Sequence, residues 1–251
     1  IVEDTIYISG DIGEDLVIFA LDLNGKEKWR TTNGNAWKKS HPGSRCSGCY
    51  DDGRLYFMNA HGRLACLNAV DGKEIWAVGI LETFESKNIT WGISESLLVD
   101  ERAVFVTPVG KQALMAALDK KTGKTLWTTP ALPDEQVTYS SPILVELGGK
   151  RQLISCGTKT VFGVDSVTGA LLWQHPHVIP GWVVGASPVY ADGSVYISNS
   201  TKDIGRVYRL RIDGDTPEIA WTAEMGDTYA GNVVCVNNMV FGSRKSNLKG
   251  W

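Results

Sequence analysis

The chain has 251 residues, of which 43% are hydrophobic and 21% are charged, and its formal net charge is −3. This composition is ordinary for a globular protein, and no apolar run is long enough for a transmembrane helix. The Lys and Arg residues form no basic patch that would neutralise phosphates, which argues against a nucleic-acid partner.

The first recognisable element is the segment 20–29, which reads ALDLNGKEKW. Related segments follow at 66–76, 117–127 and 163–173, and a degenerate copy ends near residue 221. Their terminal tryptophans are spaced 47, 51, 46 and 48 residues apart: Trp29, Trp76, Trp127, Trp173 and Trp221. A repeat of this length is typical of propeller blades.

Each repeat carries the chemistry of a tight turn between two strands. An Asp or Asn side chain can bond backbone N–H groups of the turn, and a glycine can supply a positive φ angle. The glycines in question are Gly25, Gly72, Gly123 and Gly169. The tryptophan then lies in the next strand, where its flat ring can dock on the neighbouring repeat.

The segments 53–58 and 63–67 are predicted as two earlier strands of their repeat. The apolar residues of the chain alternate, as in 195–197, without the 3.6-residue period of a helix. The fold class is therefore all-β, a propeller of four-stranded antiparallel blades in a single domain over residues 1–251. The expected order is a partial blade 1–30, blades 44–79, 91–130, 138–176 and 184–223, and a partial blade 229–251.

Both ends match incomplete blades. Residues 4–8 resemble a second strand, so the first strand is expected before residue 1. Residues 247–251 resemble a third strand with Gly250 in register with Gly163, so Trp251 is not expected to dock. More chain or a partner would be needed to close the ring, because an open propeller exposes sheet edges.

Small polar residues recur at one position of the repeats, with spacings of 49, 45, 46 and 45. They are Ser47, Ser96, Ser141, Ser187 and Asn232. We expect them on the first, innermost strand of each blade, as a ring that lines the channel. Two interpretations stay open: they face a ligand, or they satisfy hydrogen bonds between adjacent blades.

The cysteines do not predict a complete disulfide framework, because their number is odd. They are Cys46, Cys49, Cys66, Cys156 and Cys235. Cys46 and Cys49 form a CxxC pair without a second pair or nearby histidines, and on a strand they would point to opposite faces. We expect small structural cysteines rather than a redox or metal site.

The repeated unit resembles the tryptophan-docking motif of quinoprotein-like propellers. That family includes PQQ-dependent dehydrogenases and the non-enzymatic outer-membrane assembly lipoprotein, generally with eight blades. The segments 42–45, 91–96 and 139–142 also look like those of exported PQQ-binding-like β-propeller repeat proteins. This resemblance implies a periplasmic or extracellular protein whose signal peptide is not in this sequence.

A quinoprotein needs a calcium-like ion, a carboxylate base, a cation and an aromatic floor. The channel candidates for such a cofactor site are Arg45, Trp91, Glu95, Trp182 and Asn232. Arg45 could instead pair with Glu95 in a structural ion pair, and the two tryptophans could cover the core. The sequence assembles no catalytic constellation, so no catalytic residue and no metal ligand is assigned.

The four histidines are His41, His61, His175 and His177. His175 and His177 would share one face of an extended strand, which makes a metal pair conceivable. No carboxylate lies near them in the sequence, and a surface pair is the preferred interpretation.

The preferred function is a non-catalytic binding or scaffold module, as a subunit of a larger bacterial envelope or extracellular assembly. Its partner would be another protein, or a small molecule or glycan at the channel mouth. The alternatives are an alcohol or sugar dehydrogenase that uses PQQ and Ca²⁺, and a carbohydrate-active propeller that uses carboxylates such as Glu95.

Overall fold

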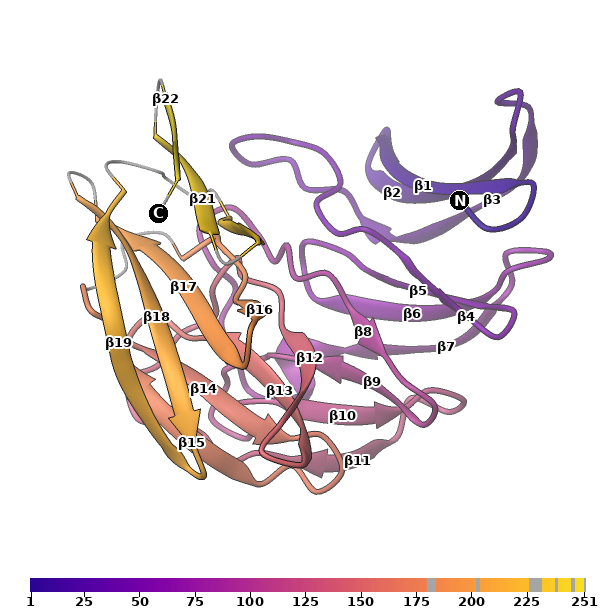
Figure 1. Ribbon diagram of the computed structural model, residues 1–251. Helices are drawn as coiled ribbons and strands as arrows, with labels where there is room; N and C mark the ends of the chain where they lie inside the picture. The colour runs from indigo at the N-terminus through magenta and orange to yellow at the C-terminus, as the bar shows by residue number, and fades with distance from the viewer. Residues whose placement is uncertain (180–183, 202–203, 226–231, 238, 245–246, 251) are drawn as a thin grey trace. The chain divides into compact units, whose positions relative to one another are not determined.

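The computed structural model describes residues 1–179, 184–201, 204–225, 232–237, 239–244 and 247–250 (Figure 1). Trp182 and Trp251 lie outside these ranges. The chain divides into two compact units, Ile1–Thr128 and Thr129–Trp251. Each unit is built from three antiparallel sheets.

The first unit begins with a three-stranded sheet and continues with two four-stranded sheets. The first sheet holds β1 (Thr5–Ile12), β2 (Asp15–Asp22) and β3 (Glu27–Asn35). The second holds β4 (Cys49–Asp51), β5 (Arg54–Met58), β6 (Arg63–Asn68) and β7 (Glu74–Gly79), and the short helix α1 (Ile80–Thr83) follows. The third holds β8 (Leu98–Val99), β9 (Ala103–Val106), β10 (Ala116–Asp119) and β11 (Thr125–Thr128).

The second unit contains two four-stranded sheets and one of three described strands. The first holds β12 (Ile143–Leu147), β13 (Lys150–Cys156), β14 (Thr160–Asp165) and β15 (Leu171–Pro176). The next holds β16 (Val189–Ala191), β17 (Ser194–Ser200), β18 (Gly205–Asp213) and β19 (Thr216–Glu224). The last holds β20 (Val234–Val236), β21 (Met239–Arg244) and β22 (Asn247–Gly250).

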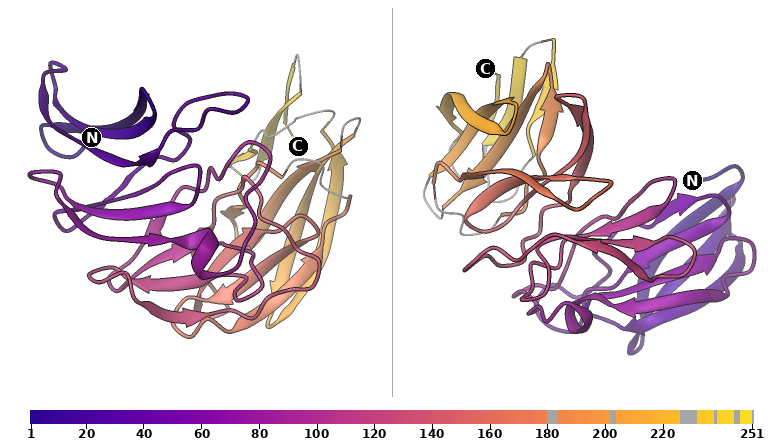
Figure 2. Two further views of the ribbon diagram at one scale, coloured as in Figure 1. Left: turned by 180° about the vertical axis from the view of Figure 1, so that it is seen from behind. Right: turned by 90° about the horizontal axis from the view of Figure 1, so that it is seen from below.

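Within every sheet the strands follow chain order, and consecutive sheets of a unit stack face to face (Figure 2). In the first unit β4 lies against β8, and in the second β16 lies against β20 and β15 against β19. This up-and-down arrangement confirms the all-β fold of four-stranded propeller blades. Buried apolar side chains fill the space between the sheets.

The predicted turn chemistry is present in the repeats. Asp22 Oδ1 accepts the backbone N–H groups of Asn24 and Lys26 at 2.9 and 2.8 Å. Asp119 and Asp165 accept N–H groups of their own turns in the same manner. These bonds fix the hairpin that leads into the tryptophan strand.

A β-bulge precedes the tryptophan of each repeat. In each pair of third and fourth strands the register shifts beside the tryptophan and leaves one unpaired residue directly before it. These residues are Lys28, Ile75, Leu126, Leu172 and Ala220. A bulge re-aims the side chain that follows it. After this bulge, Trp29 and Trp76 reach the next repeat, where their indole N–H groups donate to Ala69 O and Lys120 O.

An aromatic partner accompanies four of the five tryptophans. Their ring centroids lie 5.9 to 6.1 Å from the aromatic ring of a second strand: Tyr7 with Trp29, Tyr56 with Trp76, Phe105 with Trp127, and Tyr196 with Trp221. Such tilted pairs are favourable beyond the area that they bury.

Trp173 departs from this pattern. The residue opposite it in the register is Gly163, and the second-strand position holds Ile154 instead of an aromatic residue. The ring lies over Gly163, is 3% exposed, and donates from Nε1 to Gln152 Oε1 at 2.8 Å within its own sheet. It still packs in a cluster with Tyr208 of the following sheet.

Candidate functional site

Three of the five channel candidates meet in the first unit, in the segments that lead into β4 and β8. Arg45 and Trp91 are joined by a hydrogen bond from the guanidinium Nε to the Trp91 carbonyl. Burial is the main cause of the raised pKa of Cys46, and Glu95 raises this pKa while Arg45 lowers it, so the Cys46 thiol lies near both side chains. Asn232 belongs to the second unit, and Trp182 lies outside the described residues.

The carboxylate of Glu95 is buried, and in the described part of the chain its hydrogen bonds go to Thr107. Its Oε2 accepts the backbone N–H of Thr107 at 3.1 Å, and its Oε1 accepts the Thr107 hydroxyl at 2.9 Å. Burial raises the pKa of Glu95 to about 7, although both hydrogen bonds from Thr107 oppose this shift. A pKa near neutrality suits a general acid or base, but this side chain is only 4% exposed.

Arg45 does not form the ion pair with Glu95 that the sequence allowed. In the described part of the chain its guanidinium donates to main-chain carbonyls, those of Gly43, Ser40, His41 and Trp91. The guanidinium also lies over the Trp37 ring, 5.3 Å from its centroid. The physical reason is that the Arg45 donors are already bonded to carbonyls of its own loop and of Trp91, while the Glu95 carboxylate is bonded to Thr107 at the end of β9.

The repeat explains why a polar side chain occupies the Glu95 position. The residue directly before the small polar position is Cys46, Glu95, Ser140 or Ala186 in successive sheets. Ser140 lies beside the thiol of Cys156, the last residue of β13. Cys156 thus holds the place in its sheet that Thr107, directly after β9, holds in the preceding one. Of these four side chains, Glu95 ties its lead-in segment to the end of the second strand by hydrogen bonds, whereas Cys46 donates to the Ile93 carbonyl of the next sheet.

Sequence reasoning missed Thr107 and Trp37. Thr107 stands two residues after Phe105, at the same offset at which Cys156 follows Ile154. That fixed offset was the available signal, but only the fold shows that this position faces Glu95. Trp37 is 3% exposed and sits outside the repeated motif, so nothing in the period pointed to it.

The small polar residues lie two positions before the first strand of each sheet rather than within it. In the second unit they link neighbouring sheets: the Ser141 N–H donates to Ser187 Oγ at 2.9 Å, and the Ser187 N–H donates to Asn232 Oδ1 at 2.8 Å. These residues stand outside the strand ladder because their partners are in the adjacent sheet. The contacts favour the second interpretation, hydrogen bonding between blades.

The cysteines are all free thiols. Cys46, Cys66 and Cys156 are buried, and desolvation raises their pKa values to about 12, 11 and 12. Cys49 and Cys235 are half-buried. A raised pKa suppresses the reactive thiolate, which fits structural residues.

His177 is not part of a surface pair. Its Nδ1 lies 2.7 Å from the Tyr208 hydroxyl and its Nε2 lies 2.9 Å from the Gly157 carbonyl, and burial lowers its pKa. His175 contacts the Pro176 carbonyl. Both ring nitrogens of His177 are thus engaged. Within the described ranges no cluster of three or more His, Cys, Asp or Glu side chains suits a metal ion.

Arg45 and Glu95 do not fit the roles that PQQ and Ca²⁺ would require of them. A quinone site needs a carboxylate with acceptor oxygens, and a cation with donor groups, that are available to the cofactor. Here the Glu95 oxygens hold Thr107, and the Arg45 donors hold carbonyls. No step of a quinone reaction is therefore derived from these groups.

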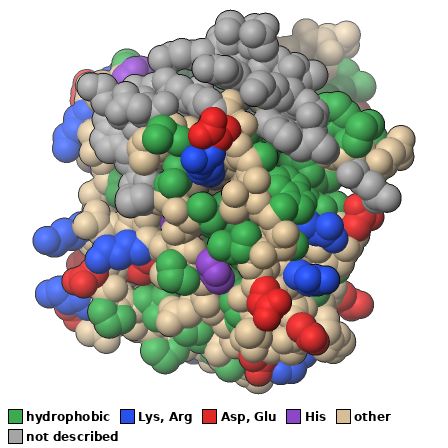
Figure 3. Space-filling model, turned by 60° about the vertical axis from the view of Figure 1, so that its left-hand side comes forward, with side chains coloured by type: hydrophobic (Ala, Val, Ile, Leu, Met, Phe, Trp, Pro, Cys, Tyr) green, Lys and Arg blue, Asp and Glu red, His purple; other side chains and the backbone are tan. Residues whose placement is uncertain are grey.

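The surface carries charges of both signs. On the face drawn in Figure 3, Lys and Arg side chains alternate with Asp and Glu, with hydrophobic side chains between them. On this face the mixture gives no single-sign field to concentrate a charged polymer. Among the residues that the structure describes, helical segments fall far short of the length and apolarity of a bilayer span.

Known proteins share this architecture. BamB from Moraxella catarrhalis superposes with a TM-score of 0.51 at 16% identity, over 98% of this chain and 81% of that one. The computationally designed Ika8 protein gives 0.66 at 12% identity, over 100% and 69%. Quinohemoprotein alcohol dehydrogenase ADHIIG from Pseudomonas putida HK5 gives 0.54 at 16% identity, over 79% and 38%. At these identities the likeness concerns the fold alone.

No curated protein matches the sequence. A family model described as outer membrane protein assembly factor BamB matches residues 14–249. Since this match spans nearly the whole chain, the protein belongs to that family of PQQ-like β-propellers.

Proposed function

We propose that the protein is a non-catalytic propeller that serves as a binding or scaffold module in a bacterial envelope or extracellular assembly. The proposal includes one propeller domain over residues 1–251, with the blade bounds expected from the repeats, and export from the cytoplasm. The five repeat tryptophans would lock the blades, and its partner would be another protein, since the family is described by its role in protein assembly.

The observation that supports this role is the use of the candidate site by the protein itself. The Glu95 carboxylate joins the segment before β8 to the end of β9, and the Arg45 guanidinium holds its own loop and Trp91. Groups that must act on a substrate need donors or acceptors free to reach it. Here the same groups hold the framework together.

Enzyme assays of the full-length protein test the proposal. The protein is incubated with PQQ and CaCl₂, freed of excess cofactor, and assayed for dye reduction with alcohols and sugars. We expect no quinone absorbance to elute with the protein and no turnover above heat-denatured protein. Turnover that is lost in the Arg45→Lys variant would overturn the proposal.

A second experiment tests the scaffold role directly. Cross-linking in intact cells, followed by purification, should yield one defined envelope protein at a fixed ratio to this chain. Recovery of the protein from the cytoplasmic fraction alone would contradict both the location and the assembly.

A further inference from the structure

A pocket of about 340 Å³ lies between the first and second sheets of the first unit. Its wall combines the rings of Tyr7, Trp29 and Tyr50 with the charged side chains of Glu3 and Lys28. Tyr7 and Tyr50 stack with their centroids 6.3 Å apart and their planes 14° from parallel. The pocket is separate from the cluster of Arg45 and Glu95. Neither the repeat motif nor the family description assigns a function to it.

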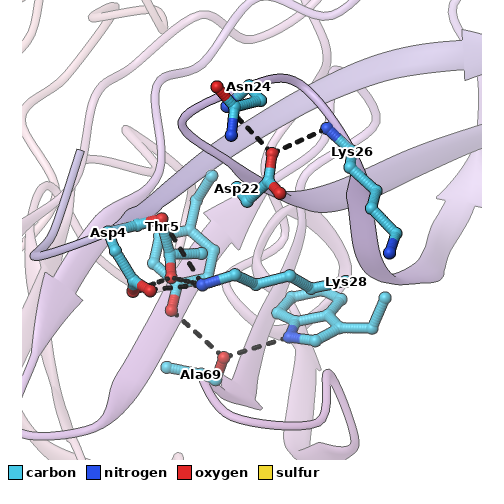
Figure 4. A network of polar contacts seen from close by, with 9 residues as sticks. Asp4, Thr5, Asp22, Asn24, Lys26, Lys28 and Ala69 are labelled. Carbon is cyan, nitrogen blue, oxygen red and sulfur yellow. Dashed lines mark hydrogen bonds and ion pairs between the residues drawn. The ribbon is translucent and has the colours of Figure 1, made fainter.

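One carbonyl holds two of the aromatic rings that line this pocket. Ala69 O accepts the Tyr7 hydroxyl and the Trp29 indole N–H, both at 3.1 Å, as the dashed lines that meet at Ala69 show (Figure 4). The two donors fix both aromatic rings against the turn of the second sheet. The aromatic wall is therefore preformed.

The next pair of sheets repeats this frame with one difference. Lys120 O accepts the Tyr56 hydroxyl at 3.0 Å and the Trp76 indole N–H at 3.1 Å. The Lys120 side chain is 9% exposed, and its Nζ lies 2.5 Å from Asp51 Oδ2. At this second interface a lysine chain of the protein itself is packed between the sheets.

The first interface lacks both members of that ion pair. Ala69 takes the place of Lys120 in the repeat, and Val2 takes the place of Asp51. Val2 pairs with Thr5 across the same tight turn by which Asp51 pairs with Arg54. The pocket thus corresponds to the space that the Lys120 chain fills one sheet further on.

The charges at the pocket favour a cation. The Lys28 ammonium is neutralised where it stands, 3.0 Å from Asp4 Oδ1 and 2.7 Å from Thr5 Oγ1 (Figure 4). Glu3 also lines the pocket, and no ion pair of Glu3 occurs in the described part of the chain. The faces of aromatic rings add further attraction for an ammonium group.

We propose that this pocket binds a primary alkylammonium group, namely the side chain of a lysine that a partner protein presents. The proposal rests on the binding role proposed above, and it specifies what the partner inserts. The incoming chain would lie along Tyr7 and Trp29 as Lys120 lies between its sheets, and its ammonium would meet Glu3.

Binding of small amines tests the pocket without any partner. In the full chain, the indole N–H resonance of Trp29 is assigned with the Trp29→Phe variant and followed during titration with n-butylammonium, which has the length of a lysine side chain. We expect a saturable shift with a dissociation constant on the order of millimolar, as befits so small a ligand. The neutral probe 1-pentanol should bind at least several-fold more weakly.

Variants locate the site. The double variant Val2→Asp with Ala69→Lys should fill the pocket with its own ion pair, abolish the shift and raise the melting temperature. Val167→Lys is the control for the added lysine, because it places the same side chain at an exposed turn of another repeat and should leave the titration unchanged. Glu3→Gln, at the rim, should weaken binding several-fold and serves if the double variant does not fold.

The source of the amine is tested with a blocked Gly-Gly-Lys-Gly-Gly peptide, its Gln counterpart and spermidine. The lysine peptide should bind at least as tightly as spermidine, and the Gln peptide should not bind. A wild-type protein with no saturable shift, an unchanged shift in the double variant, or a preference for spermidine would each overturn the proposal. None of these results depends on the dehydrogenase assay, so the two failures are distinguishable.

Discussion

The indole ring of Trp76 lies directly against Gly123 of the following repeat. A Cβ atom built on Gly123 would come within 2.8 Å of Trp76 Cε3, and one on Gly72 would come within 2.5 Å of Trp29 Cε3. The φ angle is also positive at both glycines, +73° at Gly123 and +72° at Gly72. The motif glycine therefore serves two purposes, since it shapes the turn of its own repeat and leaves room for the ring of the preceding one.

Replacing Gly123 with alanine separates these two purposes when it is compared with Gly25→Ala. Gly25 has φ of +82° and no atom within 4 Å of the added Cβ, so only backbone strain of about 1 kcal/mol is expected there. Gly123→Ala should cost a further ~2 kcal/mol or more, because the Trp76 ring must move. Urea unfolding followed by circular dichroism measures both losses; equal losses would mean that the ring contact is unimportant.

Tyr56 and Trp76 share an acceptor, which predicts that their contributions are coupled. Either single change, Tyr56→Phe or Trp76→Phe, leaves Lys120 O with one donor. The double variant leaves that carbonyl without either donor, so its loss of stability should exceed the sum of the single losses by about 1 kcal/mol.

The control cycle combines Trp76→Phe with Tyr7→Phe, whose hydroxyl donates to Ala69 O instead. Additive losses in that pair, with coupling only in the first, would support the shared acceptor. Additivity in both pairs would contradict it.

The sequence predicted the fold class of four-stranded antiparallel sheets because the features that define it are local. The turn carboxylates, the positive-φ glycines and the strand alternation all act within a few residues, so a period of repeats reveals them. Contacts between sheets are different. The inward position of Trp173 depends on Gly163 in the neighbouring strand. In the sequence, Gly163 is only the first residue of one more repeated segment, so its contact with Trp173 is not evident there.

The site was harder to predict for the same reason. Arg45 and Glu95 stand at related places in adjacent repeats, which suggested an ion pair. Their partners depend on the path of the 36–48 loop and on the end of β9, and neither is encoded by the period. The pocket beside Ala69 was missed because an alanine at this position of the repeat gives no sign of a cavity. Only the comparison with the next interface shows that a lysine side chain, that of Lys120, fills the corresponding space there.

The Glu95 pKa of about 7 predicts a pH dependence of stability. The carboxyl binds its proton more tightly in the folded chain than in the unfolded one, where the pKa is 4.5. Its contribution is fully present below about pH 4.5 and is lost as the pH rises through about 7, with a total on the order of 3 kcal/mol.

The Glu95→Gln variant keeps the shape and removes the titration. Gln can still accept the Thr107 N–H, so the variant should match the wild type near pH 4.5 and exceed it in unfolding free energy at pH 8. Urea titrations at both values measure the difference. An identical slope of stability against pH in the two proteins would rule out a raised pKa at Glu95.

The thiols should divide into two reactive and three protected groups. Cys49 and Cys235 are half-buried, whereas Cys46, Cys66 and Cys156 are buried with pKa values of about 11 to 12. Brief treatment of native protein with iodoacetamide at pH 8 should label Cys49 and Cys235 alone, and denaturant should expose all five. Peptide mass spectrometry identifies the labelled sites, and rapid native labelling of Cys46 would contradict its burial.

Gly163→Ala should displace Trp173, although φ at Gly163 does not call for glycine. A Cβ there would lie 2.3 Å from Trp173 Cε2, so the ring must leave its place over the sheet and lose its bond to Gln152 Oε1. Because Gln152 is 2% exposed, its unpaired oxygen and the disturbed packing should together cost about 2–4 kcal/mol. At the same register position Ala20 and Ala117 face tryptophans that pair with an aromatic ring instead. In the Gly163→Ala variant, Trp173 should therefore find an aromatic partner only if Ile154→Tyr is added. Urea unfolding and the Trp emission maximum measure whether this double variant recovers stability. Recovery would mean that Gly163 and Ile154 together determine the inward position of Trp173.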